Sequence, residues 1–284
     1  MSWMPAMQEP QARFFQACIV IALTVLGGVR GHAQWAGKAE QLKSVERTFG
    51  DPPGATRLDP VSRVWADSKN HRVIVDGYVA LRSGQLEMLA CLVGTKEHES
   101  IVAVFAKAQI VHAALLAVGA QQGKPVQWEP NYTPPTGSEI QVLALWRDAE
   151  GKKHHIDTRQ WVREVGSEDK VLDTNFVFAG SILWQDPDSG EKQYMAEGGD
   201  LICVSNFTTA TLDVPMKSSQ VNSGLMFAAF TERIPELGAP IRLVLQVLNG
   251  GKPRPAAPES TSRAEPAKER FKLPSLDELQ ESPK

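Results

Sequence analysis

The sequence lacks the short motifs that mark most enzyme classes. It contains no Gly-x-Ser-x-Gly elbow, no Gly-x-x-x-x-Gly-Lys-(Ser/Thr) phosphate loop, no Gly-x-Gly-x-x-Gly turn and no His-Glu-x-x-His zinc helix. Cysteine is also scarce, with three in 284 residues and no Cys-x-x-Cys pair. These absences leave no specific signature of a hydrolase, nucleotide-binding or redox protein, and they favour a non-enzymatic protein.

An excess of charge of either sign is lacking as well. The formal net charge is -3 over 284 residues, and no concentrated run of Lys and Arg occurs. Because nucleic-acid phosphates are bound by a concentrated basic face, we expect no nucleic-acid partner. The 42% hydrophobic and 22% charged residues are ordinary for a globular domain with a sizeable core.

The N-terminal apolar run is short for a membrane-spanning helix. It covers residues 14–29, whereas a helix needs about 20 apolar residues to cross a bilayer. Arg13 precedes the run, and Gly31-His32-Ala33 places small residues at the positions that signal peptidase requires before Gln34. The sequence therefore predicts a cleaved signal peptide, residues 1–33, and an exported protein in the periplasm, the cell envelope or the medium. A retained anchor is the less favoured alternative.

Two cysteines remain after that cleavage. Cys91 and Cys203 each lie in an apolar, strand-like segment. An exported protein can form a disulfide between them, but a buried cysteine that acts as a small hydrophobic side chain fits both segments better.

The remaining chain divides by composition. Residues 34–60 form a polar lead-in segment with at most one short helix around 38–47, and residues 250–284 form a Pro-, Ser- and charge-rich tail that we expect to be disordered. Between them, residues 61–249 read as a single domain. Its clearest helix covers residues 106–120, and residues 121–138 form a long Pro- and Gly-rich loop, a type of loop that often carries function.

Short apolar runs bounded by turn residues precede and follow that helix, and they are denser in the second half of the domain. This order predicts an α+β fold: a largely antiparallel β-sheet, one main amphipathic helix and a strand-rich second half.

Several segments resemble the YdjY-domain family of exported bacterial proteins. They are GTKEHES (94–100), VHAALLAVGA (111–120), GKPV (123–126), LWRD (145–148), AGS (179–181), GGDLICVSN (198–206) and TLDVP (211–215). The resemblance covers residues 61–248. It implies export and a single domain, and since the family has no established activity, it implies no catalytic residue, cofactor or partner.

The densest set of reactive side chains lies between residues 96 and 112. Lys96, His98 and Glu99 are close in the sequence, and His112 follows near the start of the predicted helix. His98, Glu99 and His112 are the candidate metal ligands of an alternative function, a metal-dependent hydrolase. The spacing argues against it, because the position four after His98 is Val102.

The long loop offers a second candidate surface. Trp128 lies among prolines and close to Tyr132, an arrangement that favours a rigid aromatic binding surface. Our leading hypothesis from the sequence is a non-enzymatic exported envelope domain that binds a protein, a peptide or a glycan. Its candidate ligand-binding residues are Lys96, His98, Glu99, His112, Trp128 and Tyr132.

Overall fold

The structure is a computed structural model that describes residues 35–219, 221 and 224–253. The expected signal peptide and residues 254–284 of the expected tail lie outside the described residues. The described helices are α2 (Ala39–Thr48) and α3 (Ala108–Ala117). Short 3₁₀ helices are η1 (Ala36–Lys38), η2 (Glu97–Glu99), η3 (Thr158–Trp161), η4 (Met195–Gly198), η6 (Thr231–Arg233) and η7 (Asn249–Gly251).

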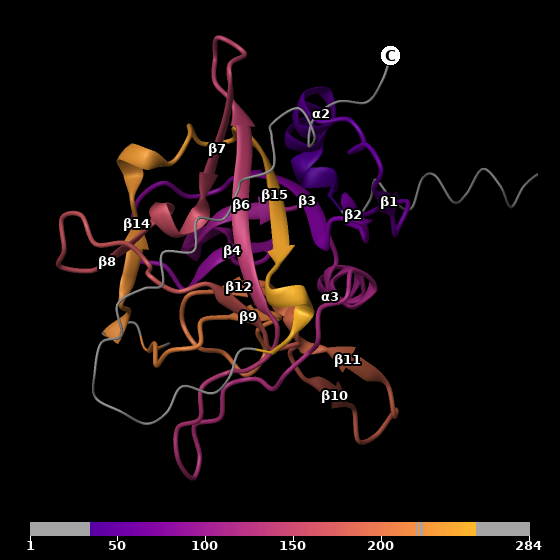
Figure 1. Ribbon diagram of the computed structural model, residues 1–284, viewed down its shortest axis with the longest axis vertical. Helices are drawn as coiled ribbons and strands as arrows, with labels where there is room; N and C mark the ends of the chain where they lie inside the picture. Colours follow the sequence, from indigo (N-terminus) through magenta and orange to yellow (C-terminus); the bar gives the residue numbers. More distant parts are fainter. Residues whose placement is uncertain (1–34, 220, 222–223, 254–284) are drawn as a thin grey trace, which may run out of the picture.

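Strands account for most of the regular structure (Figure 1). They are β1 (Thr56–Arg57), β2 (Val64–Asp67), β3 (Arg72–Val79), β4 (Met88–Leu92), β5 (Ser100–Val104), β6 (Glu139–Arg147), β7 (Lys153–Asp157), β8 (Val162–Glu164), β9 (Phe176–Phe178), β10 (Leu183–Gln185), β11 (Lys192–Tyr194), β12 (Ile202–Cys203), β13 (Leu212–Asp213), β14 (Phe227–Ala229) and β15 (Pro240–Val247).

Eight of these strands close into a barrel. Each is hydrogen-bonded to the next in the order β3-β15-β6-β9-β13-β12-β4-β5, and β5 pairs again with β3. The barrel is mixed, because β12 and β13 run parallel, as do β4 and β5, while the other neighbours are antiparallel. β2 extends the sheet beyond β3, and β7 pairs with β6. The pairs β10–β11 and β8–β14 form separate two-stranded sheets.

Strand β3 shows how the closure is encoded. Its first half pairs with β2 and its last three residues pair with β5, so β3 changes partner along its length. Gly77 lies at the change, and a Cβ atom there would overlap the backbone carbonyl of Ala103 in β5. The absence of a side chain therefore permits the close approach that closes the barrel.

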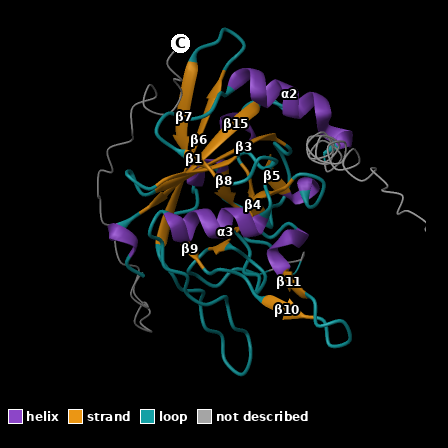
Figure 2. Cartoon of the chain, turned by 90° about the vertical axis from the view of Figure 1, so that its right-hand side faces the viewer, coloured by secondary structure: helices purple, strands orange, loops and turns teal. Residues whose placement is uncertain are grey.

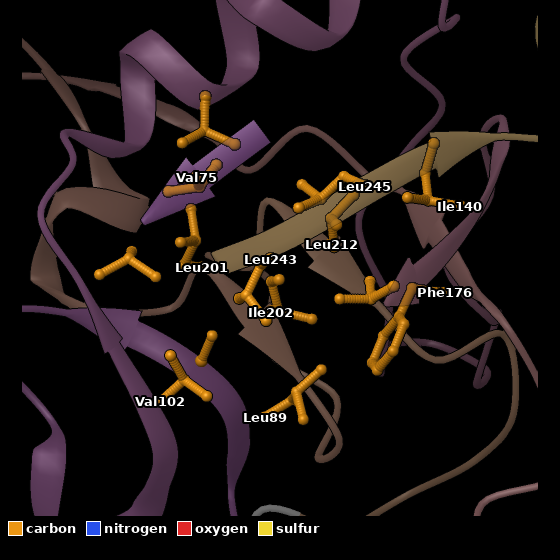
Figure 3. Close-up of a cluster of buried hydrophobic side chains, with 14 of the residues drawn as sticks. Val75, Leu89, Val102, Ile140, Phe176, Leu201, Ile202, Leu212, Leu243 and Leu245 are labelled. Atoms are coloured by element: carbon orange, nitrogen blue, oxygen red, sulfur yellow. The ribbon is translucent and has the colours of Figure 1, made fainter. Parts of the chain in front are cut away.

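Apolar side chains fill the barrel and extend under α3. Val75, Leu89, Val102, Leu212 and Leu245 come from five different strands and point toward one another (Figure 3). Strand residues of the opposite parity, such as Ile74 and Tyr78, pack into two further clusters on the outer face, as expected from the two-residue period of a strand. Both faces of β3 are thus buried.

Helix α3 forms where the Ala- and Leu-rich segment predicts it. Val111, Ala114 and Leu115 face the core, and Gly119, with φ +93°, ends the helix in the left-handed region. The backbone N–H of Gln109 in the first turn donates a hydrogen bond to Glu197 of η4 over 2.9 Å. In Figure 2, α3 crosses the view above the β10–β11 hairpin.

Helix α2 lies on the outside of β3 and β15, at the opposite end from the β10–β11 hairpin (Figures 1 and 2). A buried ion network holds its C-terminal end. Asp76 on β3 binds Arg63 at 2.5 Å and Arg242 on β15 at 2.7 Å. The two guanidinium groups also donate to the carbonyls of Phe49 and Gly50, which follow α2.

The predicted α+β fold with a largely antiparallel sheet is wrong. The chain forms a mostly-β closed barrel with a mixed sheet. Strands β9, β12 and β13 are only two or three residues long, so their sequence carries no alternation that identifies a neighbour or its direction. Strand β4 lies between β3 and β5 in the sequence, so no local sequence pattern predicts that β3 and β5 pair.

Cys91 and Cys203 are both free and fully buried. Burial raises the pKa of each thiol. The interpretation as buried hydrophobic side chains is therefore confirmed, and the alternative disulfide is not formed. No helix within residues 35–253, as far as they are described, is long and apolar enough to cross a membrane.

Candidate functional site

The long loop between α3 and β6 folds back on itself as two arms (Figure 1). Gln122 bridges Gly137, and Gln127 and Thr133 exchange two backbone hydrogen bonds of 3.0 and 2.7 Å. Gly137 allows the arms to approach the barrel, because a Cβ there would overlap the carbonyl of Phe178. The loop is thus held at its base and presents residues 128–132 at its tip.

Two aromatic rings and a lysine meet at this tip. The rings of Trp128 and Tyr132 lie 5.2 Å apart between centroids, at 55° to each other. The Lys217 ammonium lies 5.5 Å from the centroid of Tyr132, within the range of a cation–π contact. Burial, and to a smaller extent the charge of Asp213, raises the pKa of Tyr132, so its hydroxyl stays protonated and acts as a donor.

Asn206 ties the tip to the barrel. Its Oδ1 accepts a hydrogen bond from the Tyr132 hydroxyl over 3.2 Å and from the Ser218 backbone over 2.8 Å. Its Nδ2 donates to Asp213 Oδ1 and to the Val214 carbonyl, each over 3.0 Å. One buried amide therefore positions both the aromatic tip and the segment that carries Lys217.

A pocket opens between these two segments. Its volume is about 420 Å³, and the residues that line it are Trp128, Lys217, Ser219, Val221 and Met226. Val221 is 61% exposed and Met226 is 37% exposed, so apolar surface faces solvent there. The Trp128 Nε1 group is buried and finds no hydrogen-bond partner among the described residues. The pocket thus has apolar walls, one cation and one hydroxyl, and its size suits a side chain or small ligand.

A family model, the YdjY domain, matches residues 64–246. The chain belongs to the YdjY domain family. The match includes Trp128, Tyr132, Asn206, Lys217 and Met226, so every residue of the pocket lies within the YdjY domain. Neither the curated proteins nor the solved structures include a match to the chain.

Lys96 and Glu99 belong to a separate ion cluster of the YdjY domain. The Lys96 ammonium lies 2.9 Å from Asp200, 3.7 Å from Glu99 and 3.9 Å from Glu87, and 4.8 Å from the centroid of Phe207. Burial works to lower the pKa of Lys96, but the three carboxylates outweigh it and raise that pKa. Burial, together with the charge of Glu99, raises the pKa of Glu87. One lysine is thus shared by three carboxylates in this cluster.

His98 lies at the exposed edge of that cluster. Its side chain is 78% exposed, and its Nε2 lies 3.8 Å from Glu99. It lies on η2, whose first residue, Glu97, is bound instead to Lys38 over 2.7 Å and to the Gly94 backbone over 2.8 Å. Of the sequence-predicted residues, Lys96, His98 and Glu99 therefore come together.

His112 has different neighbours. Its Nδ1 lies 2.8 Å from the Tyr194 hydroxyl on β11, and its ring packs edge-on against Phe178 with centroids 4.8 Å apart. Burial lowers the pKa of His112. The neutral imidazole and the Tyr194 hydroxyl, which also contacts Gly180 and Thr211, tie α3 to the end of the barrel.

No three or more His, Cys, Asp or Glu side chains in the described part of the YdjY domain are arranged to hold a metal ion. His98 and His112 contact different partners, as the distances above show. Metal binding through His98, Glu99 and His112 stays a prediction that no ligand set in the described residues supports.

The structure pairs Trp128 with Tyr132, as their proximity in the sequence suggests, but it also adds residues that the sequence analysis missed. Asn206 lies in GGDLICVSN, one of the segments that resemble the family, so a signal for it was present. Lys217 and Met226 lie in a segment without any motif. Only the fold brings them to Trp128.

Proposed function

We propose that the YdjY domain of this chain is a non-enzymatic binding module whose pocket takes an apolar side chain of a peptide or protein partner. The observation that carries the proposal is the pocket of about 420 Å³ at Trp128, with Val221 and Met226 as apolar walls and Lys217 beside them. A partner segment with an apolar residue next to a carboxylate matches these walls and this cation.

Preorganisation supports a binding role. The loop arms pair through backbone hydrogen bonds, and Asn206 holds Tyr132 in contact with Trp128. A pocket already held in its binding geometry loses little conformational entropy when a ligand enters. Trp is also one of the side chains enriched among the energetic anchors of protein interfaces.

A peptide suits the pocket better than a glycan. Sugar recognition needs several hydrogen-bonding side chains around an aromatic face, whereas Ser219 and Lys217 are the polar side chains among those that line this pocket. Two of its walls, Val221 and Met226, are aliphatic. Such walls complement a Leu, Ile or Phe side chain.

We place this binding function outside the cytoplasm. The support is the predicted signal peptide, residues 1–33, which lies outside the described residues. If the chain is exported and cleaved, protein recovered from the bacterial periplasm begins at Gln34. N-terminal sequencing or intact mass measurement tests this part of the proposal, and an intact Met1 in that fraction would contradict it.

The binding proposal is tested by selecting peptides from a displayed random library against the full chain. We expect the selected peptides to carry an apolar residue beside Asp or Glu. Fluorescence anisotropy of a selected peptide should show about 30-fold weaker binding to Trp128→Ala, which corresponds to the roughly 2 kcal/mol of an anchoring residue. Lys217→Ala should weaken the same peptide less, since its charge lies at the surface.

Trp184→Ala is the matched control. Trp184 is 42% exposed on β10 and does not line the pocket, so the same substitution there should leave affinity unchanged. Selected peptides that bind Trp128→Ala as tightly as the unchanged chain would refute the proposed site. Binding to a glycan array that depends on Trp128, with no peptide selected, would replace the peptide by a sugar.

A further inference from the structure

The described chain ends beside the loop that carries Trp128. Pro253 forms a β-bridge with Ser138, the last residue of the loop that carries Trp128. Ser138 is five positions from Thr133 at the far end of that loop arm, which is at most about 18 Å of extended chain. The segment after Pro253 therefore starts at the base of the aromatic loop.

That segment contains one stretch with the chemistry that the pocket selects. Residues 254–270 are rich in Pro, Ala, Glu and Arg, but residues 271–279 read FKLPSLDEL. Leu276 and Leu279 flank two adjacent carboxylates, Asp277 and Glu278. An apolar side chain next to a negative charge matches apolar walls beside Lys217.

The connection is long enough. The 17 residues 254–270 span up to about 55–60 Å when extended, several times the length of the loop arm. Connections of this kind raise the local concentration of a tethered segment to roughly the millimolar range. Even weak affinity for the pocket then suffices for the segment to occupy it.

We propose that residues 271–279 of the same chain bind in the Trp128 pocket, with Leu276 or Leu279 between Trp128 and Met226 and the acidic pair facing Lys217. The proposal rests on the proposed function of that pocket. It makes the segment an internal ligand that an external partner has to displace, so the free pocket is available only when the segment leaves it.

The test keeps the whole chain until it has folded. A protease recognition site that replaces Thr261, between residues 260 and 262, allows the tail to be cut after folding and removed by dialysis. A fluorescent peptide of residues 268–282 then serves as the probe. We expect it to bind the cut chain at least about 10-fold tighter than the intact chain, because the tethered copy competes in the intact chain.

Exchanging the charges of Lys217 and the acidic pair distinguishes a specific contact from nonspecific hydrophobic binding. Lys217→Glu in the cut chain should weaken the peptide several-fold, and a peptide with Asp277→Lys and Glu278→Lys should recover affinity for that variant. A Leu276→Ser, Leu279→Ser peptide should lose binding. Since Lys217 is exposed, its substitution leaves the fold intact.

Each other outcome overturns the inference in a distinguishable way. Equal binding to cut and intact chain would show that the tail does not occupy the pocket. If library-selected peptides bind through Trp128 but the 268–282 peptide does not, the proposed function stands and the internal ligand fails. If neither binds, both fail. A concentration-dependent dimer of the intact chain, lost after cutting, would show that the segment binds a second copy instead.

Discussion

The Tyr132 hydroxyl donates a hydrogen bond to Asn206 Oδ1 over 3.2 Å, across 74 residues of sequence. This contact joins a solvent-facing loop to a residue that is fully buried beside the barrel. Because Asn206 also holds Asp213 and the Ser218 backbone, the aromatic tip is anchored through an amide whose other bonds belong to the core.

The first prediction compares the two ends of this contact. Tyr132→Phe removes one hydrogen bond and keeps the ring against Trp128, so it should cost about 0.5–1.5 kcal/mol of unfolding free energy. Asn206→Ala leaves several buried groups without partners and should cost more than about 2 kcal/mol. Urea denaturation measures both. If the two variants lost equal stability, Asn206 would not be the anchor described here.

The same pair of variants separates anchoring from ligand contact. Tyr132→Phe should retain most of the affinity for a selected peptide, whereas Asn206→Ala should lose affinity because the tip is no longer held. Fluorescence anisotropy of the selected peptide, at a temperature where both variants remain folded, measures this difference in affinity.

The second prediction concerns the buried ion network under α2. Asp76→Asn removes the charge that pairs with Arg63 and Arg242, and leaves two buried guanidinium groups uncompensated. We expect a loss of about 3–5 kcal/mol of unfolding free energy. Glu236→Gln is the control, because Glu236 is 85% exposed in its ion pair with Arg82 and should change stability by less than about 1 kcal/mol. A similar loss in both variants would contradict the assignment.

The third prediction is a pH dependence at Asp213. Burial raises the pKa of its carboxyl in the folded chain well above the usual value. For an acid whose pKa is raised by folding, the stabilising contribution is present at low pH and is lost as the pH rises through the folded-state pKa. Asp213→Asn does not titrate and retains an oxygen acceptor for Asn206 and the Val214 N–H. Its stability relative to the unchanged chain should therefore increase from pH 4 to pH 8.

Urea denaturation at several pH values measures that difference. Asp213→Ala serves as the control, because it also does not titrate but loses the acceptor, so it should be less stable than Asp213→Asn by about 1–3 kcal/mol at every pH. Parallel pH profiles for Asp213→Asn and the unchanged chain would mean that Asp213 does not titrate as described.

The fourth prediction tests the closure of the barrel. Gly77→Ala places a Cβ onto the Ala103 carbonyl, so β3 and β5 have to separate. We expect a loss of about 1–3 kcal/mol and faster hydrogen exchange at residues 102–104. Gly198→Ala is the matched control, since a Cβ at Gly198 meets no atom within 4 Å. Unchanged exchange at 102–104 in Gly77→Ala would show that the β3–β5 pairing does not depend on this glycine.

The sequence by itself determined the local features of this protein. The Ala- and Leu-rich pattern determined α3, and Gly119 its end, because helix propensity and a left-handed C-terminal residue act over a few positions. The prolines and glycines of residues 121–138 determined a long loop, and Trp128 and Tyr132 stay together in it because they are four positions apart.

The tertiary structure alone decided the barrel and the pocket. Two-residue strands such as β12 and β13 have no periodicity of their own, and they form because their neighbours present unpaired backbone groups. Lys217 lies beside the loop tip because Asn206 binds both Tyr132 and the Ser218 backbone, and Met226 is held by the hydrogen bond from the Val165 backbone to its carbonyl. The position of His112 is likewise set by burial and by its contact with the Tyr194 hydroxyl 82 residues away, which no local pattern encodes, whereas the exposed His98 stays beside its sequence neighbour Glu99.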